Sequence, residues 1–214
     1  RPTEFEDYKS LTGENGTIQV GMTDIDPPFS YQDDDVLTGF DLEYIILFAR
    51  EYGYKLELNT VDFSFILGSV QTGKYDLALG GITITDERKE MLNFTDSHYQ
   101  SSVIMVTKGN DSGQTSLSDL SDKRLGIVTG SIFSITLPPL LPDATYLEFN
   151  NYSDVISALE NGKIDAFPTD ESIYKSMLWE GSSVDRIDES IAVSDYGMIF
   201  PKGKNTKHQK EIND

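Results

Sequence analysis

The sequence predicts an α/β protein made of two similar lobes with a ligand cleft between them. Three observations indicate this: strand-like and helix-like segments alternate along the chain, the same Gly-Lys-x-Asp pattern occurs once in each half, and a polar stretch at residues 108–116 separates the halves. Alternating strands and helices are typical of mostly parallel sheets covered by helices. Ligands of such sheets bind beyond the carboxyl ends of the strands, and a cleft between lobes is the natural place for them.

The first half opens with a polar segment at residues 1–16 that lacks periodicity and is expected to be a leader or linker. A helix is expected from Gly39, because Leu42, Ile45 and Ala49 share one face at helical spacing. The other elements expected here are strands at 17–22, 55–60, 75–79 and 101–107, a turn-rich stretch at 24–35, and helices at 65–71 and 85–90.

The second half repeats this order. We expect strands at 123–128, 145–149, 164–167 and 196–200, and helices at 132–137, 153–160 (with Ser153 as its N-cap) and 171–178. The Gly-Lys-x-Asp pattern follows a helix at Gly73 and again at Gly162, where each glycine is expected to end the helix in the left-handed conformation. The predicted lobes are residues 17–107 with 196–214, and residues 112–192.

The charge of the chain excludes several classes of partner. Its 214 residues include 17 basic and 36 acidic ones, a formal net charge of −19. Nucleic acids and anionic membrane surfaces are therefore not expected as partners, since both need a basic face. No apolar run reaches the roughly 18–20 residues that cross a bilayer. The chain starts at Arg1 without a signal-peptide pattern, and we expect it to be a processed or excised piece of something longer.

Catalytic and cofactor signatures are not found in the sequence. Without cysteine there are no disulfides, zinc ribbons or catalytic thiols, and the two histidines, His98 and His208, lie far apart. No metal and no cofactor is therefore expected. The phosphate-binding loop, the dinucleotide fingerprint, the zinc-protease helix and the nucleophile elbow are also missing, so the chain is not expected to be an enzyme.

The segment from Gly80 to Arg88, GGITITDER, is the most informative one. Two glycines after a strand let the backbone approach a ligand closely, and Thr85 is placed to cap the next helical turn. Arg88 then lies in a first turn, where the helix dipole disfavours a cation, unless its guanidinium binds a carboxylate. The alternative is a surface arginine that pairs with Asp86 or Glu87.

Three further positions have a functional and a structural interpretation. Asp170 follows a strand and either holds a ligand ammonium or simply caps the next helix. Residues 128–131, from Val128 to Ser131, form a junction between a strand and a helix. The free N–H groups of this junction suit an anion, although junctions of this kind are common. Phe63 either stacks on a ligand or belongs to the core.

Several ordered segments resemble the polar amino-acid-binding proteins of ABC importers, solute-binding protein family 3. The segments cover roughly residues 17–205 and occur in the same order as in the family. They are PPF at 27–29, TGFD at 38–41, VDF at 61–63, QTGKYD at 71–76, GGITITDERKEMLNFTDSHY at 80–99, and residues 117–120, 123–131, 158–170 and 196–203. The block at 80–99 is the most specific of them. The resemblance implies a type II periplasmic-binding fold, with two lobes joined by two crossover strands.

The resemblance also implies roles for individual residues. Arg88 would hold the ligand carboxylate, helped by Thr83 and by the main chain near Ser131. The ligand ammonium would be held by Asp170 together with Thr83 and the carbonyl of Gly81. Phe63 would stack on the ligand.

The chain departs from glutamine-binding relatives in its side-chain pocket. Their first-loop aromatic residue is replaced by Asp26, and the polar positions that read the side chain are Thr23, Val128 and Thr169 here. Glutamine specificity is therefore not implied. Asp26 is expected either to attract a cationic side chain or to point to solvent.

The function implied is binding of an amino acid by a monomer outside the cytoplasm, in the periplasm or at the outer cell surface. Hinge closure on the ligand would be read by a membrane ABC permease. Two alternatives remain: a ligand-sensing domain of a multidomain membrane receptor, with its own signalling module or as one of tandem binding domains, and, more remotely, a periplasmic dehydratase on the same fold. The dehydratase needs a positioned acid in the cleft, and the motif-level acid, Asp170, is assigned to the ammonium.

Overall fold

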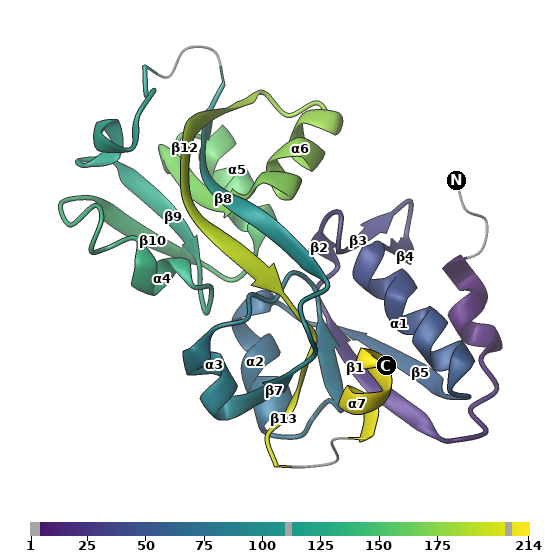
Figure 1. Ribbon diagram of the computed structural model, residues 1–214. Coiled ribbons are helices and arrows are strands. Elements are labelled where there is room, and N and C mark those ends of the chain that lie inside the picture. Colours follow the sequence, from purple (N-terminus) through teal and green to yellow (C-terminus); the bar gives the residue numbers. More distant parts are fainter. Residues whose placement is uncertain (1–4, 110–112, 204–206) are drawn as a thin grey trace. The chain divides into compact units, whose positions relative to one another are not determined.

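A computed structural model describes residues 5–109, 113–203 and 207–214 (Figure 1). The chain forms two compact units, residues 1–99 with 195–214 (unit 1) and residues 100–194 (unit 2). It passes into unit 2 within strand β8 (Tyr99–Lys108) and returns within strand β12 (Val184–Tyr196). The sequence placed the first boundary at the polar stretch 108–116, of which residues 110–112 lie outside the described residues. A strand that continues from one unit into the next leaves no change of composition at the crossing.

Unit 1 is built on a five-stranded sheet in the order β5-β1-β6-β13-β7. Strand β1 runs parallel to β5 and β6, whereas β13 is antiparallel to β6 and β7. The strands are β1 (Thr17–Met22), β5 (Lys55–Thr60), β6 (Leu77–Leu79), β7 (Leu92–Phe94) and β13 (Ile199–Pro201). Helices α2 (Phe63–Gln71) and α3 (Asp86–Met91) belong to the same unit.

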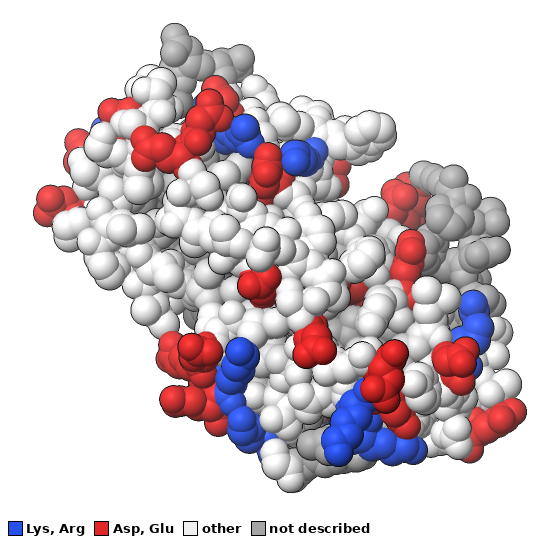
Figure 2. Space-filling view, viewed as in Figure 1, with Lys and Arg blue, Asp and Glu red and all other residues white. Residues whose placement is uncertain are grey.

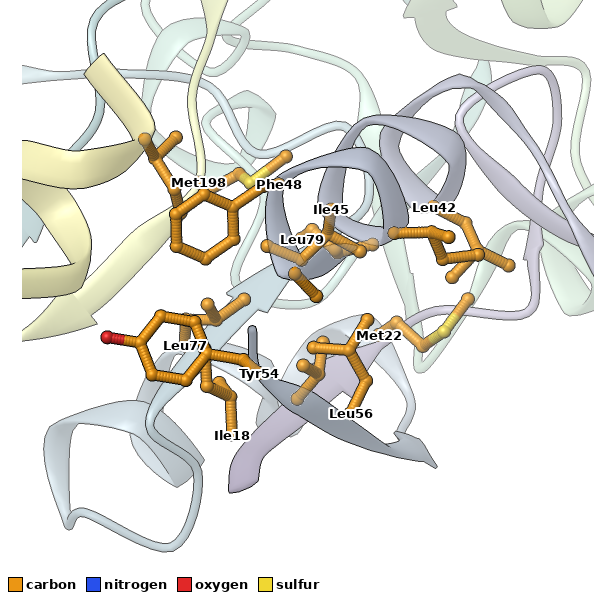
Figure 3. Packing of buried hydrophobic residues seen from close by; sticks show 14 of the residues in the cluster. Ile18, Met22, Leu42, Ile45, Phe48, Tyr54, Leu56, Leu77, Leu79 and Met198 are labelled. Atoms are coloured by element: carbon orange, nitrogen blue, oxygen red, sulfur yellow. The ribbon is translucent and has the colours of Figure 1, made fainter. Parts of the chain in front are cut away.

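The core of unit 1 lies between helix α1 (Phe40–Glu51) and this sheet (Figure 3). Leu42, Ile45 and Ala49 are fully buried, so the helical periodicity of the sequence is confirmed. They pack against the alternating side chains of β1, of which Ile18 and Met22 point the same way from the strand. Burial of this stripe is what fixes α1 on the sheet.

Two segments of unit 1 differ from the sequence prediction. The leader contains a 3-10 helix, η1 (Phe5–Ser10), and buries Leu11 in the core of the unit, so it packs as part of the fold. The turn-rich stretch at 24–35 holds strands β2 (Ile25–Asp26) and β3 (Ser30–Asp33), which form a small antiparallel sheet with the next strand, β4 (Val36–Thr38). These strands are short and are interrupted by prolines and aspartates, so their sequences show no alternation of apolar and polar residues.

Unit 2 has a second five-stranded sheet in the order β10-β9-β11-β8-β12. Strand β9 (Arg124–Val128) is parallel to β10 (Thr145–Phe149) and β11 (Ala166–Asp170), and β11 is antiparallel to β8. The helical segments are η2 (Leu117–Leu120), α4 (Phe133–Thr136), α5 (Tyr152–Glu160) and α6 (Glu171–Trp179).

The repeated Gly-Lys-x-Asp pattern has the same structure in both units. Gly73 and Gly162 have φ values of 78° and 69°, and each ends its helix in a Schellman motif, with main-chain bonds from the glycine and from the next lysine back into the helix. The aspartate that follows exchanges two hydrogen bonds with a strand of its own unit, β1 in unit 1 and β9 in unit 2. Asp76 binds Gln19 in β1, and Asp165 binds Arg124 in β9. This match supports an internal duplication.

Three predicted boundaries in the second half are wrong. Helix α5 starts one residue earlier and is capped by Asn151, whose side chain accepts from the N–H of Asp154 at 2.9 Å, so Ser153 is not the N-cap. Strand β11 begins at Ala166 and extends to Asp170. The strand expected at 196–200 is the end of β12 followed by β13.

The C-terminal helix α7 (Lys207–Asn213) contributes Ile212 to the core of unit 1. None of the described helices combines the length and hydropathy that a membrane span needs. On the face shown in Figure 2, basic side chains lie in small groups beside acidic ones. Arg186 forms ion pairs with both Glu171 and Asp188.

Candidate ligand-binding site

In unit 1 the candidate site begins at the carboxyl ends of the adjacent parallel strands β1 and β6. Thr23 follows β1 and Gly80 follows β6, and the last residues of the two strands are paired. A Cβ atom on Gly80, whose φ is 117°, would lie 2.5 Å from the Thr23 hydroxyl and 2.8 Å from the Ser30 hydroxyl. These two buried hydroxyls are 2.9 Å apart. Glycine is therefore required where the backbone meets this polar wall.

Asp26 belongs to the same wall. Its side chain is buried, with 3% of the residue exposed, and Oδ2 lies 3.3 Å from the position that a Cβ atom would take on Gly81. The alternative that Asp26 points to solvent is therefore wrong. A buried carboxylate therefore lies beside the Gly80-Gly81 turn.

Asp41, at the start of α1, holds the Gly80-Gly81 turn in place. Its Oδ2 accepts hydrogen bonds from the N–H of Gly80 at 3.1 Å and of Gly81 at 3.4 Å, and its Oδ1 lies 2.9 Å from Nε2 of His98. The residue is 1% exposed. The sequence assigns Asp41 no role, because Gly80, Gly81 and His98 lie far from it along the chain.

Arg88 lies in α3, which Thr85 caps as predicted: the Thr85 hydroxyl accepts from the N–H of Arg88 at 3.1 Å. Its guanidinium folds back and donates from Nη1 to the carbonyl of Thr83 at 2.6 Å. Only 6% of the residue is exposed, so the interpretation as a surface arginine is wrong. The loop of Thr83 is held in turn by a bridge to Tyr196.

Two aromatic residues of unit 1 differ in their surroundings. Phe63 is the first residue of α2, after the carboxyl end of β5, and it is buried but is not part of the core under α1. Phe29 packs edge-on against Tyr99 and Tyr196, at centroid distances of 5.0 and 4.9 Å. Phe29 therefore has a packing role, while stacking of Phe63 on a ligand stays a prediction.

In unit 2 the candidate residues also follow parallel strands. Val128 ends β9, Thr169 lies near the end of β11, and both are buried. Ser131 donates its main-chain N–H to the carbonyl of Val128 at 3.0 Å, so that group is already used within the turn. The hydroxyls of Ser131 and Thr169 are buried and make no hydrogen bond with the described residues. The turn can therefore offer the Ser131 hydroxyl to a ligand, and β11 can offer the Thr169 hydroxyl.

Asp170 has the most unusual environment in unit 2. It occupies the N-cap position of α6, yet its side chain makes no capping hydrogen bond, so the interpretation as an ordinary cap is wrong. The residue is 4% exposed, and its Oδ1 has no hydrogen-bond partner among the described residues. Burial raises the pKa of Asp170 to about 7, although a hydrogen bond from Ser101 opposes the shift.

Near the carboxyl ends of their parallel strands, unit 1 carries the buried Asp26 and Arg88, and unit 2 carries the buried Asp170. Unit 1 offers the Arg88 guanidinium for an anion, and unit 2 offers the Asp170 carboxylate, which needs a cation to become charged at low cost. Within the described residues no three His, Asp or Glu side chains gather as metal ligands do. This chemistry suits a small zwitterion.

Known proteins were compared with the chain. A sequence model of the bacterial extracellular solute-binding proteins, family 3, matches residues 18–137. The chain belongs to this family. The match includes Arg88, the Gly80-Gly81 turn and Ser131, while Asp170 lies beyond it.

Relatives within family 3 carry the names of amino-acid-binding proteins. The arginine-binding extracellular protein ArtP of Bacillus subtilis is 33% identical over 141 residues, which are 65% of this chain and 55% of ArtP. The L-cystine-binding protein TcyJ of Escherichia coli is 27% identical over 94% of this chain and 76% of TcyJ. The ABC transporter glutamine-binding protein GlnH of B. subtilis is 28% identical over 83% of this chain and 66% of GlnH.

Solved structures confirm the two-lobed type II periplasmic-binding fold. An ancestral arginine-binding protein bound to glutamine superposes with a TM-score of 0.85 at 32% identity, covering 92% of this chain and 89% of that one. An arginine-bound, truncated arginine-binding protein from T. maritima superposes with a TM-score of 0.86 at 24% identity, over 97% of this chain and 96% of that one, which bears on the fold alone.

Proposed function

We propose that this chain binds an α-amino acid outside the cytoplasm and delivers it to a membrane ABC permease, and that it is not an enzyme. Arg88 of unit 1 binds the ligand carboxylate, and Asp170 of unit 2 binds the ligand ammonium. One ligand engages both units, and closure about β8 and β12 retains it. The ABC-transporter names of family 3 relatives support the permease as partner.

The observation that carries this proposal is the environment of Asp170. A carboxylate that is buried, at an N-cap position it does not use, and with Oδ1 lacking a partner among the described residues is costly to ionise. A ligand ammonium removes that cost by pairing with it. Such an arrangement has no evident value for folding, since a capping hydrogen bond would stabilise α6 better.

The remaining residues fill supporting roles in this proposal. The carbonyl of Gly81 and the hydroxyl of Thr83 assist at the ammonium, while Thr83 and the Ser131 hydroxyl assist at the carboxylate. Phe63 stacks on the aliphatic part of the ligand. Thr23, Asp26, Val128 and Thr169 surround the side chain.

A thermal-shift screen against the twenty L-amino acids tests the proposal. A ligand that binds the native state alone raises the midpoint of unfolding by mass action. We expect one or a few amino acids to raise it, and the same compounds to leave the Arg88→Ala variant unchanged. If no amino acid shifts the folded wild-type protein, amino-acid binding is contradicted.

A further inference from the structure

The ligand-binding segment of unit 1, residues 80–88, is attached to the rest of the unit at two points. At its start, the two main-chain N–H groups of the Gly80-Gly81 turn donate to Oδ2 of Asp41 in α1, at 3.1 and 3.4 Å. Near its middle, Thr83 forms an antiparallel bridge with Tyr196 at the end of β12. These two attachments fix the backbone that carries the proposed ligand contacts.

His98 contacts both attachments. Its Nε2 lies 2.9 Å from Oδ1 of Asp41, and because a carboxylate only accepts hydrogen bonds, the imidazole donates this one. The two oxygens of Asp41 are thereby divided, Oδ1 to His98 and Oδ2 to the glycine turn. The main-chain N–H of His98 donates to the carbonyl of Tyr196 at 3.1 Å. One residue outside the segment thus links the start of the segment to its middle.

The imidazole of His98 is held in the orientation that this hydrogen bond requires. The rings of Phe40 and Tyr44 in α1 each lie 6.1 Å from it, centroid to centroid, with interplanar angles of 22° and 11°. The hydroxyl of Tyr44 is fixed in turn, because it donates to the carbonyl of Ile212 in α7 at 3.1 Å. The His98 side chain is 11% exposed, and the low local dielectric strengthens its bond to Asp41.

Asp41 acts on the candidate site through the position of the N–H groups that it holds. Without the donor at Oδ1, the buried carboxylate loses one of its hydrogen bonds and one of the contacts that fix its rotation. The glycine turn and Thr83 are then less well ordered before the ligand arrives. Ordering them on binding costs affinity, which a preorganised segment does not lose.

We propose that His98 is a positioning residue for ligand binding, which orients Asp41 and, through it, the Gly80-Gly81 turn. This inference rests on the proposed function, because the Gly81 carbonyl and Thr83 are the ligand contacts that His98 places. His98 itself does not touch the ligand.

Amide hydrogen exchange of the ligand-free protein, followed by NMR, tests the positioning. The variant His98→Phe keeps an aromatic ring but removes the donor. In it, we expect the amides of Gly80 and Gly81 to exchange at least about tenfold faster, relative to the amides of β1. The comparison with β1 separates this effect from a loss of overall stability, which speeds exchange in both places. The amide of His98→Gln can donate in place of Nε2, so this variant should keep the wild-type rates within about threefold.

Titration calorimetry then measures the affinity for the amino acid that gives the largest shift in the screen of the twenty L-amino acids. We expect His98→Phe to bind it at least about tenfold more weakly, and His98→Gln to stay within about threefold of the wild type. His208→Phe is the matched control. His208 also lies beside a carboxylate, Glu211 at 3.4 Å, and against the ring of Tyr54, and its replacement should change neither measurement.

Glycine amides that keep their exchange rates in His98→Phe overturn the inference, while amino-acid binding by the wild type stands. Faster exchange with unchanged affinity also overturns it, and so does an equal loss of affinity in His98→Gln. If His98→Phe does not fold, His98→Gln and His98→Asn give the same test, since asparagine is one methylene too short to replace Nε2. If the wild type binds no amino acid, both the inference and the proposed function are contradicted.

Discussion

Asp170 links the chemistry of the candidate site to the stability of the chain. Its pKa rises from 3.8 to about 7 on folding because it is buried, so between these pH values the native chain holds a proton that the unfolded chain has released. The native state is therefore favoured by this group below about pH 4 and loses that advantage as the pH rises toward 7.

Replacing Asp170 by asparagine should remove this pH dependence. We expect the free energy of unfolding of Asp170→Asn, relative to the wild type, to increase between pH 4 and pH 7 by on the order of 4 kcal/mol. Urea unfolding at pH 4, 5.5 and 7, without ligand, measures it. A difference between the two proteins that stays constant over this range would show that Asp170 is not destabilised by its surroundings.

Arg88 gives a second prediction at the scale of a residue. Arg88→Ala should lower the affinity for the bound amino acid by about 3–5 kcal/mol, because the ligand carboxylate loses a forked, charge-assisted contact in a buried site. Titration calorimetry measures the loss. Lys89→Ala is the control, as it removes an exposed cation that pairs with Asp86 in the same helix, and it should bind normally. If Arg88→Ala and Lys89→Ala weaken binding equally, Arg88 acts through the overall charge of the chain and does not contact the ligand.

At the scale of elements, the sequence predicts the features that depend only on residues close together in the chain. Helix α1 follows from the spacing of Leu42, Ile45 and Ala49, and the repeated glycines follow from helix termination. The network of Asp41 with His98 could not be predicted, because its partners are brought together only by the tertiary fold. For the same reason, the sequence did not decide whether Asp26 is buried or exposed.

Replacing two glycines by alanine, one within α2 and one just after it, should change the free energy of unfolding in opposite directions. Gly73 has a φ of 78° after the end of the helix, so Gly73→Ala should lower the free energy of unfolding by about 1 kcal/mol. Gly68 lies inside the helix with open space around it, so Gly68→Ala should raise that energy by up to about 1 kcal/mol. Thermal unfolding of both variants measures the effects. If Gly73→Ala is as stable as the wild type, the Schellman motif does not limit the stability of unit 1.

At the scale of the whole molecule, the division of the chain into two α/β units separates the two residues to which we assign the ligand's α-groups. Arg88 lies in α3, which follows β6 in unit 1, and Asp170 is the last residue of β11 in unit 2. The sequence alone left both residues with structural alternatives, and the resemblance to family 3 gave them roles. The sequence predicts lobes of residues 17–107 with 196–214 and of residues 112–192, and the units divide within β8 at residues 99–100 and within β12 at residues 194–195.

The central claim is that one ligand uses its carboxylate on unit 1 and its ammonium on unit 2. Titration calorimetry with the amino acid found in the screen, its deaminated acid and its decarboxylated amine tests this most directly. We predict that the wild type binds the amino acid at least about 100-fold more tightly than either analogue, since each leaves one buried charge unpaired. An analogue that binds as tightly as the amino acid would contradict the account.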